Sequence, residues 1–595
     1  MGNEAICSEK AELIKQGRTS LGIEFGSTRI KAVLVDFSGE VLGVGFHDWE
    51  NSLTDGIWTY PLDEIHAGLK KCYTSLRKNV EEKYGVTLKK ICSMGISAMM
   101  HGLMAFDKVG RLLTPFKTWR NSDTETAADE LTRVFNFNIP LRWTIAHIYQ
   151  AVLDKKDYVK ELDFAVTLAG YIHFKLTGER VIGVGDAAGI FPVENGNYNE
   201  KMIKDFEKLV LDKGYHVKLM ELFPKVLSAG DNAGSLTSEG AAFLDESGNL
   251  EAGVPMCPPE GDAGTGMVAT NSVAVGTGNV SAGTSIFAML VLEKGLSKLY
   301  REIDMVTTPD GYPVAMAHAN NCTSDLNAWV NIFREFAELF GIKADMGELY
   351  GRLYNASLSG DKDCDGLLSY GYYSGEGIVH LNEGRPLFAR MPESKFNLAN
   401  FMRSHLYASL GSVKIGLDIL LKDEKVKVTK IMGHGGLFKT PLVAQSYLAA
   451  AVNAPVTVMD TAGEGGPWGM AVLASYLLNK DRLATENELN IQKKQVMSDL
   501  DMLKKSYDKA VATNKDISED LLKAREKITK YIDSLQNMKI NISALARFKN
   551  QAFALAKERD YLLRKNDSLT RINKAIRKDL DSVSVKLTST SAKVD

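Results

Sequence analysis

The sequence has few cysteines, no long apolar run and, in its last part, neither glycine nor proline. Its six cysteines are scattered over 595 residues without a C-x-x-C pair, which argues against a zinc site or a disulfide framework and fits reduced thiols. No apolar run approaches the roughly 20 residues that a membrane helix needs, and the first twenty residues lack the apolar core of a secretory signal. We therefore expect a cytoplasmic protein without a membrane partner.

The remaining composition is that of a globular protein. Hydrophobic residues make up 45% of the chain and charged residues 24%, and the net charge is −3. These values exclude a collagen-like or mainly disordered chain, and the length suffices for two large cores.

Glycine and proline end at Gly469 and Pro467, which marks a change of module. Residues 490–595 contain 23 Lys and Arg against 14 Asp and Glu, and apolar residues from Val496 to Leu545 alternate spacings of four and three. This heptad pattern predicts a coiled-coil tail that could form a homo-oligomer. A long helix that folds back on the body, or an exposed helical extension, remains the alternative. Because lysines alternate with acids, as on a solvated helix face, we do not expect a nucleic-acid partner.

The body of the chain begins with a predicted β-hairpin. The segment LGIEFGSTRIKAVLVD (21–36) has the pattern of two strands joined by a tight turn at Gly26-Ser27-Thr28, and a third strand follows at 40–46. Small residues at a hairpin tip leave the backbone N–H groups accessible, so that they can bind phosphate oxygens. Glu24, just before the turn, would direct its carboxylate to the same place.

A second hairpin of the same kind follows about 255 residues later. The segment TGNVSAGTSIFAMLVLE (277–293) has its turn at Gly283-Thr284-Ser285. Either turn alone is equally consistent with an ordinary hairpin. Together they indicate two similar domains that face each other across a cleft and clamp the phosphates of a nucleotide.

Three further glycine-rich segments are candidates for binding or catalysis. In PPEGDAGTGMVAT (258–270), small neighbours leave the Asp262 carboxylate accessible, and phosphoryl transfer needs a carboxylate that accepts the proton of the attacking hydroxyl. A turn-forming aspartate is the alternative. GHGGLFKTP and EGGPWGMAVLA each predict a glycine loop that leads into a helix, where an anion or a flat ring can lie against the backbone, although plain α/β connections are equally consistent.

The order of these motifs resembles that of the FGGY carbohydrate kinases, and within them the kinases of five-carbon ketoses. The resemblance covers roughly 21–478 and rests on GIEFGSTRIK, SAMMHGLMAFDKVGRLLTPFKTWRN, LAGYIHFKLTGERVIGVGDAAGIF, EGDAGTG, NVSAGTS, GLLSYGYYSGEG and the two glycine loops above. It implies an α/β fold of two actin/hexokinase-like (ribonuclease H-like) domains with an interdomain cleft. The expected order is an N-terminal extension (1–20), a sugar-binding domain (21–270), an ATP-binding domain (271–485) and the coiled-coil tail (490–595).

The resemblance also implies an activity and a set of site residues. The expected reaction is ATP-dependent phosphorylation of the terminal hydroxyl of D-xylulose or L-ribulose, with ATP and Mg²⁺ as cofactors and Asp262 as general base. The metal would be held by Glu24 and Asp262. The sugar would be bound by Met100, His101, Trp119, Asn121 and Asp262. ATP would be bound by Ser27, Thr28, Lys31, Gly283, Thr284, Ser285, Gly435, Gly436 and Phe438.

The chain departs from the family pattern at two positions of the expected site. Glu24 stands where the family usually has Asp, and the sugar turn has Asn121 in place of an acid. The alternative function is an actin-like ATPase, or a regulatory or assembly protein that oligomerises through the tail and lacks sugar kinase activity.

Overall fold

The computed structural model describes residues 2–379, 381–458 and 465–481, which belong to a compact unit that extends to Thr485. The predicted coiled coil at 490–595 lies outside the described residues. None of the helices in the described ranges is both long and apolar enough to cross a membrane.

The first domain is built on a five-stranded sheet in the order β13-β6-β1-β2-β3. Its strands are β1 (Thr19–Phe25), β2 (Arg29–Asp36), β3 (Val41–Asp48), β6 (Ser93–Ala98) and β13 (Glu260–Gly261). β1, β2 and β3 are antiparallel neighbours, whereas β6 and β13 run parallel to β1. The predicted first hairpin and third strand are therefore confirmed.

The second domain repeats this arrangement with one extra edge strand. Its six-stranded sheet has the order β16-β17-β15-β14-β20-β21. The strands are β14 (Thr277–Ala282), β15 (Ile286–Val291), β16 (Ile303–Thr307), β17 (Pro313–Ala319), β20 (Lys430–His434) and β21 (Val456–Thr457). β14 and β15 form the predicted second hairpin, and β20 runs parallel to β14 as β6 does to β1.

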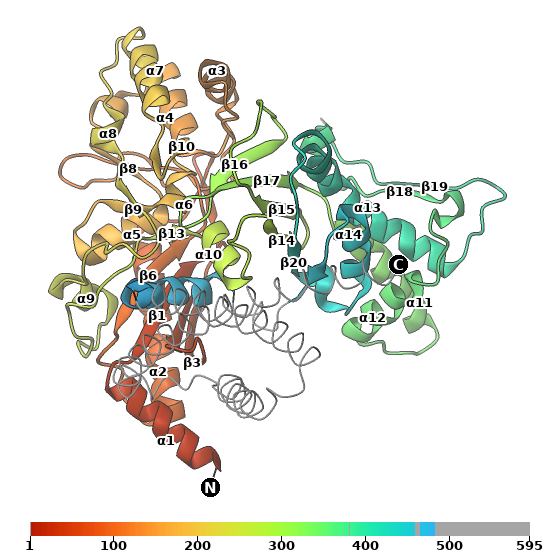
Figure 1. The fold of residues 1–595 in the computed structure, drawn as a ribbon, viewed down its shortest axis with the longest axis horizontal. Coiled ribbons are helices and arrows are strands. Elements are labelled where there is room, and N and C mark those ends of the chain that lie inside the picture. The colour runs from red at the N-terminus through yellow and green to blue at the C-terminus, as the bar shows by residue number, and fades with distance from the viewer. Residues whose placement is uncertain (1, 380, 459–464, 482–595) are drawn as a thin grey trace, which may run out of the picture. The chain divides into compact units, whose positions relative to one another are not determined.

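Helices cover both sheets (Figure 1). In the first domain α2 (Leu62–Tyr84) packs so closely on β3 that a Cβ on Gly45 would lie 2.3 Å from the backbone nitrogen of Leu76. In the second domain α13 (Leu398–Asp418) packs on β17 and β15 and buries most of its length. Each sheet therefore has its own hydrophobic core.

The other helices and strands complete the two domains. A third core unites α3, α4 and α7, which lie between β6 and β13 in the chain. The bounds are α1 (Gly2–Lys15), β4 (Ser52–Thr54), β5 (Ile57–Thr59), β7 (Met104–Phe106), α3 (Glu125–Phe135), α4 (Thr144–Leu153), η1 (Asp157–Lys160), β8 (Phe164–Val166), α5 (Leu168–Thr177), β9 (Val181–Gly183), α6 (Val184–Ala187), β10 (Val193–Glu194), β11 (Asn197–Tyr198), α7 (Glu200–Leu211), α8 (Leu219–Leu222), β12 (Lys225–Leu227), α9 (Ser238–Leu244), α10 (Asp262–Ala269), α11 (Ser324–Leu339), α12 (Met346–Ser357), η2 (Cys364–Gly366), β18 (Leu368–Tyr370), η3 (Gly377–Val379), β19 (Leu387–Ala389), η4 (Ile419–Asp423), η5 (Gly436–Lys439) and α14 (Val443–Val452).

The helix of residues 465–481 packs on the first sheet, although it comes from the end of the chain that we assigned to the second domain. A Cβ on Gly22 of β1 would lie 2.1 Å from the carbonyl oxygen of Pro467, so only glycine allows this approach. The Trp468 indole donates a hydrogen bond to the Gly39 carbonyl at 2.8 Å. The helix thereby brings Gly466 beside the end of β1.

Candidate active site

The two predicted phosphate turns lie at the tips of the equivalent hairpins of the two sheets. In the first, the Gly26 N–H donates to the Arg29 carbonyl at 3.0 Å, and in the second the Gly283 N–H donates to the Ser285 carbonyl at 2.9 Å. Thr28 and Thr284 are exposed, and Ser27 and Ser285 are partly exposed. Small polar residues and accessible backbone therefore occupy both tips, as an anion site requires.

Glu24, at the end of β1, shares its surroundings with Asp262. Ser97 and Thr265 each donate a hydroxyl hydrogen bond to Glu24 Oε2 at 3.3 Å. Burial, and then the negative charge of Asp262, raises the pKa of Glu24 to about 8, although the hydrogen bonds from Ser97 and Thr265 and the charge of Lys31 oppose the shift. Lys31 stands directly opposite Glu24 in the β1–β2 register. The structure thus brings together both predicted metal ligands and one predicted ATP ligand.

Asp262 is the first residue of α10, where a carboxylate is favoured by the helix dipole. Met100 N–H donates to Asp262 Oδ1 at 3.2 Å, which ties the predicted base to a predicted sugar ligand. Water reaches the carboxylate, but protein surrounds it on most sides, and this desolvation raises its pKa against the opposing hydrogen bonds of the Met100 and Ala263 N–H groups. The position before Asp262 requires glycine, because a Cβ on Gly261 would lie 2.0 Å from Met100 Cγ.

His101 adopts a left-handed backbone conformation, with φ of 72°, in the turn after β6. The turn is held by the Gly102 N–H, which donates to the Arg142 carbonyl at 2.9 Å. The imidazole is buried and stacks on Trp143 with a centroid distance of 6.3 Å, and protein encloses its Nδ1 next to Gly189. Burial lowers the pKa of His101 well below its usual value, so the ring is neutral at neutral pH and can donate or accept one bond at a sugar hydroxyl.

The two remaining sugar candidates lie together in the loop after Thr118. Trp119 is 42% exposed, whereas Asn121 is buried. The Asn121 amide already has partners: Oδ1 accepts from Trp58 N–H at 2.9 Å, and Nδ2 donates to the carbonyls of Trp58 at 2.8 Å and Thr118 at 3.1 Å. The structure therefore gives Asn121 a role in holding the loop, and its contact with a sugar stays a prediction.

Two buried carboxylates beside Asp262 were not predicted as site residues. Asp186, in α6, accepts a hydrogen bond from Thr167 Oγ1 at 2.5 Å, while its Oδ1 has no partner among the described residues. Burial, and then the charge of Asp262, raises the pKa of Asp186 to about 7. Asp186 stands in GVGDAAG, with the same small neighbours that singled out Asp262. That signal could have identified it.

Glu260, two residues before Asp262, holds the backbone of α6. Its carboxylate accepts hydrogen bonds from the N–H groups of Gly185 at 3.3 Å and Asp186 at 3.1 Å. Burial, and then the charge of Asp186, raises the pKa of Glu260 to about 8. Nothing in the sequence around Glu260 indicates this contact, because it joins residues 75 positions apart.

Three predicted ATP residues, Gly435, Gly436 and Phe438, follow β20. Gly435 has φ of 97°, and a Cβ there would lie 2.4 Å from the Ala282 carbonyl oxygen, so the turn requires glycine. Gly436 begins η5, whereas the Phe438 ring is buried beneath Gly433 in the core of the second domain. A Cβ on Gly466, from the second glycine loop, would lie 1.6 Å from Glu24 Oε2. This loop therefore meets the predicted metal ligand.

The described residues could supply two carboxylate ligands, Glu24 and Asp262, to a magnesium ion whose remaining ligands are water and phosphate oxygens. Within the described ranges, no three His, Cys, Asp or Glu side chains are grouped closely enough to hold a metal. Glu24 and Asp262 repel each other, however, and a divalent cation between them would relieve that repulsion. Mg²⁺ commonly takes one or two carboxylates and completes its shell with water and phosphate oxygens, so the pair is a suitable donor set.

Comparisons with known proteins match two domain models and a curated relative to this chain. The N-terminal domain model of the FGGY family of carbohydrate kinases matches residues 19–268, and the C-terminal domain model matches residues 278–478. Xylulose kinase of Haemophilus influenzae is 23% identical over 478 residues, which cover 77% of this chain and 90% of that protein.

Solved structures share the fold at lower identity. The ligand-bound xylulose kinase of Lactobacillus acidophilus has a TM-score of 0.64 at 16% identity, with 78% of this chain and 89% of that one covered. Glycerol kinase of Plasmodium falciparum with ADP has a TM-score of 0.61 at 14% identity, with 78% and 90% covered.

Proposed function

Because the chain belongs to the FGGY family of carbohydrate kinases and is an ATP-dependent sugar kinase, we propose that its acceptor is the terminal hydroxyl of a ketopentose, D-xylulose or L-ribulose. The observation that carries this proposal is the hydrogen bond from Met100 N–H to Asp262, because it joins the expected base to the expected sugar site. The relative named xylulose kinase supports a five-carbon ketose.

In the proposed mechanism Asp262 accepts the proton of the acceptor hydroxyl while the hydroxyl oxygen attacks the terminal phosphorus of ATP and ADP leaves. The Met100 N–H and the N-terminus of α10 orient the carboxylate. Its raised pKa makes it a stronger base than an exposed aspartate, provided that it is ionised when the sugar binds.

Other side chains position the reactants and stabilise charge. The neutral His101 imidazole hydrogen-bonds a sugar hydroxyl. The small residues at the two hairpin tips present N–H and hydroxyl groups to phosphate oxygens. Mg²⁺, when bound beside Glu24 and Asp262, supplies positive charge that offsets the phosphate oxygens.

The test is a coupled measurement of ADP release with ketopentoses, ketohexoses, sedoheptulose and glycerol as acceptors. We expect a ketopentose to give the highest kcat/KM, and Asp262→Asn to lower kcat by about 10²- to 10⁴-fold without changing the Kd for ATP. Asp245→Asn is the control for the same chemical change, because the Asp245 carboxylate holds only the turn at 245–250. Near-normal turnover in Asp262→Asn, or equal rates with and without every acceptor, would contradict the proposal.

A further inference from the structure

The carbonyl oxygens of the first phosphate turn are all held by side chains or backbone from one neighbouring segment. The Trp49 indole N–H donates to the Gly26 carbonyl at 2.7 Å, and the Tyr60 hydroxyl donates to the Ser27 carbonyl at 2.6 Å. The backbone N–H of Trp49 donates to the Thr28 carbonyl at 3.2 Å. Three consecutive peptide groups of the turn are thereby fixed from the same side.

The two donor rings form a rigid support. They stack with a centroid distance of 4.1 Å, and Trp49 also meets Phe25 edge-on at 5.8 Å. Trp49 is 7% exposed and Tyr60 is 1% exposed. The two residues flank the short β4–β5 hairpin, which brings them together.

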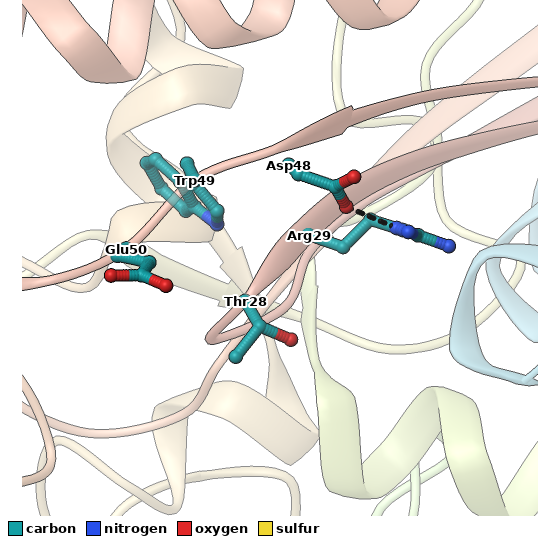
Figure 2. A pocket seen from close by; sticks show the side chains of 5 residues that line it. All are labelled: Thr28, Arg29, Asp48, Trp49 and Glu50. Atoms are coloured by element: carbon teal, nitrogen blue, oxygen red, sulfur yellow. Dashed lines mark hydrogen bonds and ion pairs between the residues drawn. The ribbon is translucent and has the colours of Figure 1, made fainter.

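Figure 2 shows this flank of the turn, with Thr28 at the tip, the Trp49 indole next to it, and Arg29 paired with Asp48 at 2.5 Å. These residues and Glu50 line a groove of about 620 Å³. The Arg29–Asp48 ion pair is exposed to solvent and therefore restrains the turn only weakly. The buried Trp49 and Tyr60 rings provide the stronger restraint.

The geometry of the peptide bond determines where the N–H groups of the turn point once its carbonyls are fixed. In a trans peptide the carbonyl and the N–H of the next residue point in opposite directions. Because the Gly26 and Ser27 carbonyls point to the aromatic pair, the N–H groups of Ser27 and Thr28 point away from it. An anion on that side meets two N–H groups, whereas a flipped peptide would present a carbonyl oxygen that repels it.

We propose that Trp49 and Tyr60 are positioning residues of the phosphate site, which hold the Gly26 and Ser27 carbonyls so that the Ser27 and Thr28 N–H groups face the phosphates of the nucleotide. The inference deepens the proposed function and rests on it for the identity of the phosphate donor.

The second hairpin supports this interpretation, because its turn carbonyls also accept hydrogen bonds, although from other groups. Thr323 donates to the Gly283 carbonyl from its backbone N–H at 3.2 Å and from its hydroxyl at 2.7 Å. The Cys322 N–H donates to the Thr284 carbonyl at 2.9 Å. Aromatic side chains in one domain and the segment before α11 in the other thus donate hydrogen bonds to the carbonyls of the corresponding turns.

The experiment compares ATP with adenosine in Trp49→Phe and Tyr60→Phe, which remove the donors and keep an aromatic ring at each position. We expect each variant to raise the Kd for ATP by about fivefold to tenfold, as loss of one hydrogen bond does. The Kd for adenosine, measured by calorimetry, should stay unchanged because adenosine carries no phosphate. A general loss of packing would weaken both ligands, so the ATP-to-adenosine ratio isolates positioning.

Two variants serve as controls. Tyr73→Phe removes a buried hydroxyl that has no hydrogen-bond partner among the described residues, and Phe116→Leu alters the ring beside Tyr60 at 6.4 Å without removing a donor. Neither should change the ATP-to-adenosine ratio, although Phe116→Leu should lower the melting temperature.

Wild-type Kd values for ATP in both variants, or equal weakening of ATP and adenosine, would overturn the proposal. If Trp49→Phe does not fold, Tyr60→Phe alone decides, because it removes a single oxygen atom. The Kd values for ATP and adenosine are measured without a sugar. If the wild-type protein phosphorylates no ketose, the proposed acceptor is wrong, but the comparison of the two Kd values still tests the role of Trp49 and Tyr60.

Discussion

The buried His173 predicts how the stability of the first domain changes with pH. His173 lies in α5, which packs on the strand before the sugar residues, and its Nε2 is hydrogen-bonded to the Ala233 carbonyl at 2.9 Å. Burial lowers the pKa of His173 to about 4, against roughly 6.5 in an unfolded chain. The unfolded state therefore binds the proton more readily, and the free energy of unfolding falls as the pH falls from about 6.5 to about 4.

The two pKa values give the size of this effect. At pH 5 the His173 contribution costs about 2 kcal/mol of folding free energy relative to pH 8, and below pH 4 it approaches about 3.4 kcal/mol. His173→Gln keeps an N–H donor for the Ala233 carbonyl and removes the titrating ring. We expect its free energy of unfolding, measured by urea titration, to fall by about 2 kcal/mol less than that of the wild type between pH 8 and pH 5.

The control for this measurement is His216→Gln, since His216 is exposed. It should follow the wild-type curve. An equal loss of stability in His173→Gln and in the wild type over this pH range would refute the reasoning, because it would show that His173 titrates alike in the folded and unfolded chains.

Three further changes test the site and the tail. Asp186→Asn replaces one carboxylate oxygen of Asp186 by an amide nitrogen. Because Asp186 and Met100 of the expected sugar site both lie against Gly261, we expect the KM for the ketose to rise by about tenfold while the KM for ATP stays constant; equal changes in both would contradict a role of Asp186 on the sugar side. Glu24→Gln should raise the Mg²⁺ concentration needed for half-maximal rate, and an unchanged metal dependence would remove Glu24 from the metal site. Removal of residues 490–595 should lower the number of chains per particle, obtained from light scattering, if the heptads form a coiled coil, and an unchanged number of chains would contradict an oligomerising tail.

The features that the sequence predicts well are local. Both hairpins follow from alternating apolar residues on either side of a Gly-hydroxyl turn, and the structure has them with Glu24 opposite Lys31 and Ala282 opposite Ile286. The exposure of the Asp262 side chain at the start of α10 follows from its small neighbours. These signals depend on residues that are adjacent in the chain, so periodicity and turn chemistry suffice to find them.

What the sequence does not predict depends on contacts between distant segments. The helix of residues 465–481 packs on β1 because Gly22 has no Cβ, a complementarity that spans about 445 residues. The hydrogen bonds of Glu260 with the backbone N–H groups of α6 also join distant segments, and so do those of Trp49 and Tyr60 with the first turn. Such contacts follow from the folded arrangement rather than from any one stretch of residues.

Asn121 shows how a departure from a family pattern can have a structural cause. Its amide donates to two carbonyls and accepts from Trp58 N–H, and a carboxylate could make only the last of these bonds. Asn121→Asp, which restores the acid usual in the family, should therefore leave the Trp58 carbonyl without its side-chain donor and place a charge in a buried loop.

We expect Asn121→Asp to lower the free energy of unfolding by about 1–3 kcal/mol, measured by urea titration at pH 8, where the new acid is ionised. Lys117→Gln is a suitable companion variant, because it alters a charge in the same loop and leaves the Asn121 amide bonds in place. If Asn121→Asp were as stable as the wild type, the amide would not be what holds this loop, and the replacement of acid by amide would have to be explained by what the loop binds instead.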